Sequence, residues 1–212
     1  MLLLSLAHKH NKLLHLTKED TIMDFIGHFI SSLAKLCFDL VVLLFLLRIL
    51  IQRVDIDVLN PVAQTIMRWT QKPLHFLQKI PRVAQLDTPA IIFVFLLNIV
   101  KIALIALTFG KLPNFIGLVI WSTGDLIGQL FTLYFYLILI GALLSWFVPV
   151  HQTPVIFVIH KLTNPLFSRA RKIIPLIGNI DFSPIVILLV LQLISSLLLA
   201  PIMQLGAQLA LR

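Results

Sequence analysis

The residues whose chemistry stands out are two charged side chains inside long apolar runs. Asp39 lies within the run 25–51, and Lys101 lies within the run 89–109. Each is 12 residues from one end of its run (51 − 39 and 101 − 89), which is about 18 Å along a helix. If the two helices run antiparallel, both charges lie at one depth. We expect an intramembrane ion pair, because an unpaired charge in hydrocarbon costs at least about 2.5–3.5 kcal/mol.

Two interpretations of this pair remain open. It is either a tie that fixes the register of two helices, which we favour, or part of a proton or ion relay. Lys35 lies one turn before Asp39 and competes for its carboxylate. A third basic residue, Arg48, lies one turn from the end of its run, so we expect its side chain to reach the lipid head groups.

The rest of the sequence offers no catalytic chemistry. It shows no Ser-His-Asp arrangement and no glycine-rich phosphate loop, so we predict that the protein is not an enzyme. No histidine lies deep in an apolar run, so we expect no haem, metal or other cofactor. The single cysteine, Cys37, has apolar neighbours and is predicted to be an inert buried thiol. Gly124 and Gly128 are interpreted as helix-packing positions.

Composition places these residues in a membrane. The chain is 59% hydrophobic and 12% charged, whereas soluble domains carry about 25% charged residues. We predict an all-α membrane protein with four spanning helices, in the apolar runs 25–51, 89–109, 126–148 and 182–211. The apolar segment 114–122 is too short to span, so it either extends the third helix or dips into the interface.

The chain repeats itself with a period of about 93 residues. Pro61 matches Pro154 (154 − 61 = 93), and Thr70 matches Thr163 (163 − 70 = 93). We therefore predict two tandem two-helix units, residues 24–110 and 111–212, after a polar, irregular extension over 1–23; initiation at Met23 would remove most of that extension. The positions equivalent to Asp39 and Lys101 in the second unit are Thr132 and Ser196, so hydroxyls replace the ionic centre there.

Basic residues predict the orientation of the chain. The loops 53–88 and 149–181 carry 9 of the 17 Lys and Arg residues, and the opposite side carries five. Positively charged short loops stay in the cytoplasm, so we expect both loops there, with both termini outside. The net charge of +8 then lies beside anionic lipid head groups, which we favour over nucleic acid as its partner.

The second loop reads as two amphipathic helices lying in the membrane surface. They cover 155–162 and 166–173, on either side of Pro165. The apolar residues expected to be buried in the membrane are Ile156, Ile159, Leu162, Phe167 and Ile174. Those expected at head-group level are Arg169, Arg171 and Lys172. Pro175 ends the second helix, Gly178 allows a turn, and Asp181 or Ser183 caps the next helix, with Pro184 in its first turn. Asp87 offers the same helix start in the first copy.

The segment 162–192 resembles the signature repeat of the YggT family, also called YlmG. The second copy matches closely through Trp146, Pro165, Arg169, Arg171, Lys172, Pro175, Gly178, Asp181, Ser183 and Pro184. The first copy matches more loosely, through Arg48, Pro61, Thr70, Pro73, Pro81 and Asp87. There are two departures: Gly141 stands where the first copy has Arg48, and Arg53 stands where the second has Trp146.

The resemblance implies a multi-pass protein of the bacterial inner membrane. The family is linked to osmotic-stress tolerance, to division or chromosome organisation and, in plastids, to the assembly of membrane complexes. We therefore expect a non-catalytic scaffold or assembly factor with a membrane protein partner that the sequence does not identify. The alternative is a small transporter or channel component, which would have to act as a homo-oligomer because four helices are few for a pathway.

Overall fold

The structure is a computed structural model of the 212-residue chain. It describes the backbone of residues 2–54, 56, 59–77, 80–81, 87–108, 112–145, 153–173 and 183–211, and the side chains of these from residue 25 onward, except those of 145 and 173. Every element within these ranges is helical, which confirms for them the all-α part of the predicted fold class. The elements are α1 (Leu2–Arg53), α2 (Pro61–Leu74), the 3₁₀ turn η1 (His75–Leu77), α3 (Thr88–Thr108), α4 (Phe115–Ser145), α5 (Pro154–Ile173), α6 (Ser183–Ile194), the π-helical turn η2 (Ser195–Leu199) and α7 (Ala200–Ala210).

Among the described residues, three helices are long and apolar enough to cross a membrane. They are Thr88–Thr108, Phe115–Leu144 and the continuous helix Ser183–Ala210, which joins α6, η2 and α7. The prediction of four spanning helices is wrong on this count. The difference lies in the segment 25–51, which belongs to α1 and carries Lys35, Asp39 and Arg48 among its apolar residues. The start of α4 at Phe115 confirms that the apolar segment 114–122 mainly extends the third predicted helix.

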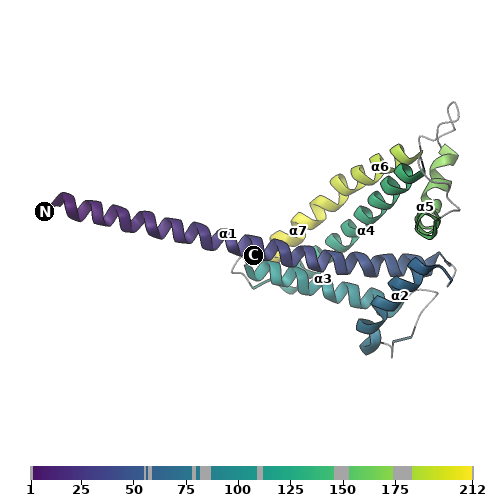
Figure 1. The fold of residues 1–212 in the computed structure, drawn as a ribbon, viewed down its shortest axis with the longest axis horizontal. Coiled ribbons are helices and arrows are strands. Elements are labelled where there is room, and N and C mark those ends of the chain that lie inside the picture. The colour runs from purple at the N-terminus through teal and green to yellow at the C-terminus, as the bar shows by residue number, and fades with distance from the viewer. Residues whose placement is uncertain are drawn as a thin grey trace.

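The N-terminal extension is helical rather than irregular. The backbone of α1 continues without a break from Leu2 to Arg53, and its first part projects away from the other helices (Figure 1). No glycine or proline precedes Gly27, so the sequence contains no strong helix breaker there. The prediction of an irregular segment is therefore wrong, because residues 2–23 consist mostly of residues that are compatible with a helix.

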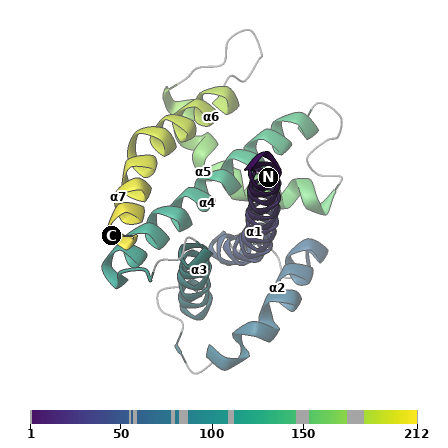
Figure 2. The same ribbon diagram turned by 90° about the vertical axis from the view of Figure 1, so that its left-hand side faces the viewer.

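The helices form two pairs that diverge toward one end of the molecule. α1 packs beside α3, and α4 packs beside α7 (Figures 1 and 2). The two pairs lie close together near the C-terminus and separate toward α2 and α5 (Figure 1). α2 and α5 therefore share one end of the bundle, and the C-terminus lies toward the other. The hydrophobic core lies where α1, α3, α4 and α5 meet, around Phe45, Val94, Leu137 and Leu162.

Glycines allow α4 and α7 to approach closely. A Cβ atom on Gly117 would lie 2.1 Å from the backbone nitrogen of Ala210, and one on Gly206 would lie 2.5 Å from that of Trp121. Any larger residue would force the two backbones apart. Gly124 also faces α7, where a Cβ atom would meet Met203 at 3.0 Å, so its interpretation as a packing position is confirmed.

The two loop helices meet at their N-termini through one side chain. The carboxamide oxygen of Asn60 caps α2 by accepting from the backbone nitrogen of Val62 at 2.9 Å and from that of Ala63 at 3.3 Å. The Nδ2 atom of Asn60 donates to the backbone oxygen of Pro154 at 3.1 Å, at the start of α5. Asn60 thus links the loop helices of the two halves.

The proline inside each loop helix does not end it. α2 runs through Pro73, and α5 runs through Pro165 as one helix, so the predicted division into 155–162 and 166–173 is wrong. A proline removes one backbone hydrogen bond and bends a helix, but packing against the rest of the protein can hold such a helix in place. The apolar face of α5 supplies such contacts. Ile156, Ile159 and Leu162 are buried within the protein, where we had expected them to be buried in the membrane.

Candidate functional site

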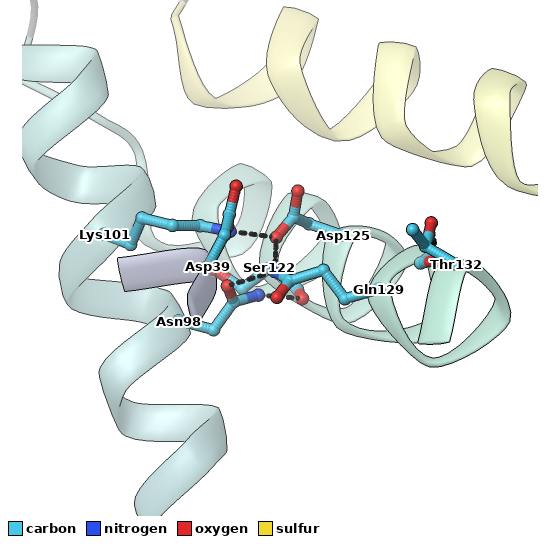
Figure 3. A network of polar contacts seen from close by, with 8 residues as sticks. Asp39, Asn98, Lys101, Ser122, Asp125, Gln129 and Thr132 are labelled. Atoms are coloured by element: carbon cyan, nitrogen blue, oxygen red, sulfur yellow. Dashed lines mark hydrogen bonds and ion pairs between the residues drawn. The ribbon is translucent and has the colours of Figure 1, made fainter. Parts of the chain in front are cut away.

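Asp39 and Lys101, which were predicted to pair, are in contact, and a third charged residue, Asp125, joins them. The ammonium group of Lys101 on α3 donates to Asp39 Oδ1 on α1 at 2.8 Å and to Asp125 Oδ2 on α4 (Figure 3). Lys101 therefore bridges carboxylates from two other helices. One of these helices belongs to the first repeat and the other to the second, so the contact joins the two halves of the chain.

Hydrogen bonds extend this centre along α3 and α4. Asn98 Nδ2 donates to the backbone oxygen of Ser122 at 2.7 Å. Gln129 Nε2 donates to Asp125 Oδ2 at 2.7 Å and to Asn98 Oδ1 at 3.4 Å (Figure 3). Residues three, four or seven apart share one face of a helix, which places Asn98 with Lys101, and Ser122 with Asp125 and Gln129. We call these five residues, together with Asp39, the polar cluster.

The polar cluster is closed at its centre and more open on one side. The side chain of Lys101 is 1% exposed, that of Asp125 12% and that of Asp39 34%. One ammonium and two carboxylates give a formal charge of −1 when all three are ionised. Lys35, the expected competitor, is exposed, and no ion pair within the described chain joins it to Asp39. Ser122 Oγ and Gln129 Oε1 are buried and find no hydrogen-bond partner among the residues that the structure describes.

Sequence reasoning missed Asp125, Asn98 and Gln129. The predicted third spanning run, 126–148, begins directly after Asp125 and so does not include this carboxylate. The available signal was the spacing of 122, 125 and 129, which puts three polar residues on one face of an apolar helix. Their partner helix could not be read from that spacing.

The second repeat has a neutral counterpart to the charged centre. Thr132 Oγ1 donates to the backbone oxygen of Gly128 at 2.9 Å, and Ser196 Oγ donates to that of Leu193 at 3.2 Å. Both hydroxyls are exposed and bond within their own helix. The backbone of each helix therefore satisfies its hydroxyl, and the two hydroxyls do not pair with each other in the described chain.

Arg48 forms a second buried centre, at the end of the bundle near α2. Its Nε donates to Asp87 Oδ2 at 2.7 Å, and its Nη1 donates to Thr70 Oγ1 at 2.8 Å and to the backbone oxygen of Met67 at 3.3 Å. The side chains of Arg48 and Asp87 are 6% and 1% exposed. The expectation that Arg48 extends to the head groups is therefore wrong, because an acceptor for each side of the guanidinium lies inside the fold. A cavity of about 560 Å³ beside Arg48 is also lined by Gln52 and Gln71.

The same position in the second repeat is occupied by a glycine. Gly141 faces α5, where a Cβ atom would meet Ile159 at 3.0 Å. Thr163, the counterpart of Thr70, is buried and donates to the backbone oxygen of Ile159 at 2.8 Å. The second repeat therefore replaces the Arg48 centre with close helix packing.

The remaining predicted site residues lie in three settings. Arg169, Arg171 and Lys172 are exposed on the last turns of α5, with Arg171 stacked 5.5 Å from the ring of Phe167. Pro61 begins α2, Ser183 begins α6 and is buried, and Pro184 follows it in the first turn. Trp146, Ile174, Pro175, Gly178 and Asp181 lie outside the described residues. Cys37 is exposed, so the prediction of a buried thiol is wrong; its neighbours Leu36 and Leu40 are exposed as well, so this face of α1 is not covered by another helix.

The fold and the site define a helical membrane protein with an internal duplication and a charged centre between its halves. A family model described as CCB3/YggT matches the chain twice, over residues 27–108 and 120–202, and the two matches start 93 residues apart (120 − 27). The chain belongs to the CCB3/YggT family, which confirms the resemblance seen in its repeats.

Relatives in several bacteria extend over most of the chain. An uncharacterized protein in the proC 3′ region of Vibrio alginolyticus is 34% identical over 170 residues, covering 76% of this chain and 89% of that protein. The uncharacterized protein YggT of Escherichia coli (strain K12) is 30% identical over 169 residues, covering 78% and 87%. The uncharacterized protein PA0392 of Pseudomonas aeruginosa is 32% identical over 163 residues, covering 76% and 83%. No solved structure matches the chain significantly.

Proposed function

We propose that this protein is a non-catalytic scaffold or assembly factor of the bacterial inner membrane. The observation that carries the proposal is the closed centre of the polar cluster. Lys101 is 1% exposed and its ammonium is bound to two carboxylates of the same chain. A residue that handles a substrate or an ion needs access to it, whereas a residue that fixes helices needs partners within the fold. The contacts of Lys101 fit the second role.

The surface offered to a partner is the basic end of the bundle. Arg68 and Lys72 of α2, and Arg169, Arg171 and Lys172 of α5, are exposed, and both helices lie at the same end (Figure 1). We place this end on the cytoplasmic side, because short basic loops are retained there. In that orientation the guanidinium and ammonium groups meet anionic head groups and the acidic surface of a membrane protein partner.

The proposal is tested by capture of the partner from native membranes. A tagged protein is crosslinked in cells, purified and analysed by mass spectrometry, beside a variant with Arg169→Glu, Arg171→Glu and Lys172→Glu. We expect a defined membrane protein with the unchanged chain and its loss from the charge-reversed variant. Lys35→Gln, which removes an exposed charge away from the basic end, is the matched control and should retain it. Identical recovery from all three proteins would contradict the proposal.

The physiological setting is tested by complementation. A strain lacking the gene should grow poorly at high osmolarity or divide abnormally, and the unchanged chain should restore both. The charge-reversed variant should restore neither while reaching the membrane at normal levels. Full restoration by that variant would show that the function does not require the basic residues at this end of the bundle.

A second candidate, a transporter or channel component, is favoured by one observation. The polar cluster has a formal charge of −1, and Asp39 is 34% exposed at the side of the bundle. In an oligomer that covers this side, Asp39 would line the interface. Proton and cation flux into proteoliposomes tests this candidate. A saturable flux that Asp39→Asn abolishes would support it over the scaffold.

A further inference from the structure

Two polar side chains on the spanning helices of the second repeat face outward without a hydrogen-bond partner in the described chain. Gln192 on α6 and Tyr136 on α4 are exposed, and neither forms a hydrogen bond within the described chain. Gln192 is nine residues after Ser183, so it lies about 13.5 Å along the spanning helix (192 − 183 = 9). That depth is well inside the hydrocarbon, beyond the reach of water at the surface.

These side chains line a cleft between α4 and α6. Its volume is about 200 Å³, and Thr132 and Ser195 contribute further hydroxyls to its wall. The π-helical turn η2 begins at Ser195, directly at the cleft. Turns of this kind occur often at functional sites, because they shift the backbone and the side chains that follow. The cleft therefore combines a local irregularity with polar groups at membrane depth.

Lipid tails cannot satisfy such groups. A carboxamide left without hydrogen bonds in an apolar medium costs several kcal/mol, so a polar face at this depth calls for a polar partner. The carboxamide of Gln192 can donate and accept hydrogen bonds, and so can the hydroxyl of Tyr136. A surface of this chemistry is complementary to itself across a two-fold axis.

We propose that a second copy of this chain binds at the α4–α6 cleft. In this dimer, Gln192 of each copy donates to and accepts from the Gln192 carboxamide or the Tyr136 hydroxyl of the other. The apolar wall of the cleft, Phe131 and Phe135, packs against the facing helices. The proposed interface uses none of the residues of the polar cluster, so it does not depend on whether the protein acts as a scaffold.

Crosslinking of single cysteines in native membranes locates the interface. In a Cys37→Ser background, Leu189→Cys places a thiol one turn before Gln192 on the proposed interface, and Val190→Cys places one about 160° away from Gln192 around the helix. Both positions are exposed, at 59% and 46%. We expect crosslinked dimers with Leu189→Cys and few with Val190→Cys. Equal crosslinking at both positions, none at either, or an adduct with a different protein would overturn the proposal.

The contribution of the carboxamide is tested in the same assay. Adding Gln192→Leu to the Leu189→Cys protein keeps the bulk of the side chain and removes its hydrogen bonds. We expect the association constant of the dimer to fall by about threefold or more, because about threefold is the effect of losing one interhelical hydrogen bond. Gln204→Leu, at an exposed position nearer the other end of the same span, should leave it unchanged. A dimer that persists at full strength with Gln192→Leu would refute the assigned contact.

Discussion

Removing both carboxylates around Lys101 should cost far more than removing either alone. With Asp39→Asn, the ammonium of Lys101 keeps Asp125; with Asp125→Asn, it keeps Asp39. Each single variant also relieves the repulsion between two carboxylates that share one cation. We therefore expect each to lower the free energy of unfolding by about 1 kcal/mol, less than the 3–5 kcal/mol typical of breaking a buried pair.

The double variant leaves Lys101 without a counter-charge. Its side chain is 1% exposed, so no solvent compensates for the lost pairs. We expect a loss of about 3–5 kcal/mol, which exceeds the sum of the single losses by about 1–3 kcal/mol. Adding Lys101→Met to the double variant removes the stranded charge and should recover much of the stability.

The assay is reversible unfolding by dodecyl sulfate in lipid–detergent bicelles, followed by far-ultraviolet circular dichroism. Thr132→Val, at the neutral counterpart of Asp39 in the second repeat, is the matched control. Its hydroxyl is exposed and, within the described chain, bonds only inside its own helix, so the change should be below about 0.5 kcal/mol. If the two carboxylate losses simply add, Lys101 does not depend on both partners and the reasoning about a shared cation fails.

Two further predictions follow from buried contacts elsewhere in the bundle. Arg48→Leu strands the carboxylate of Asp87, whose side chain is 1% exposed, and should cost about 3–5 kcal/mol; the pair Arg48→Leu with Asp87→Leu should recover part of this loss in the same unfolding assay. Gly206→Ala should lower the melting temperature markedly, because its Cβ would lie 2.5 Å from the backbone nitrogen of Trp121, whereas Gly27→Ala has open space and should be neutral or slightly stabilising. A mild effect of Gly206→Ala would show that α4 and α7 are not in close contact.

The contact between Asp39 and Lys101 could be predicted because helical rise converts residue number into depth. The same rule did not predict Asp125. Its role depends on α4 crossing close to the α1–α3 pair, and the spacing of residues within one chain segment does not show which helices cross. An apolar run that starts at Leu126 excludes Ser122 and Asp125, and with them the spacing of polar residues that indicates a polar face on this helix.

The orientation of Arg48 shows a different limit. Its position near a helix end suggested an outward path, but Thr70 and Asp87 occur in the same repeat signature and supply acceptors inside the fold. The sequence shows that Arg48, Thr70 and Asp87 belong to the repeat signature, but it does not show that their side chains meet. In α5, likewise, the spacing of Ile156, Ile159 and Leu162 indicated an apolar face, but it could not tell whether lipid or protein covers that face.

The most direct test of a closed, structural polar cluster is the reactivity of a thiol placed inside it. Ser122 is fully buried on the same face of α4 as Asp125, and its hydroxyl has no hydrogen-bond partner among the described residues. The change Ser122→Cys in a Cys37→Ser background therefore alters the packing little. We predict no labelling by charged, water-soluble thiol reagents from either side of the membrane, while Phe76→Cys, at a position that is 90% exposed, reacts readily. Rapid labelling of Ser122→Cys would reveal a water-filled path to the polar cluster and would contradict the account.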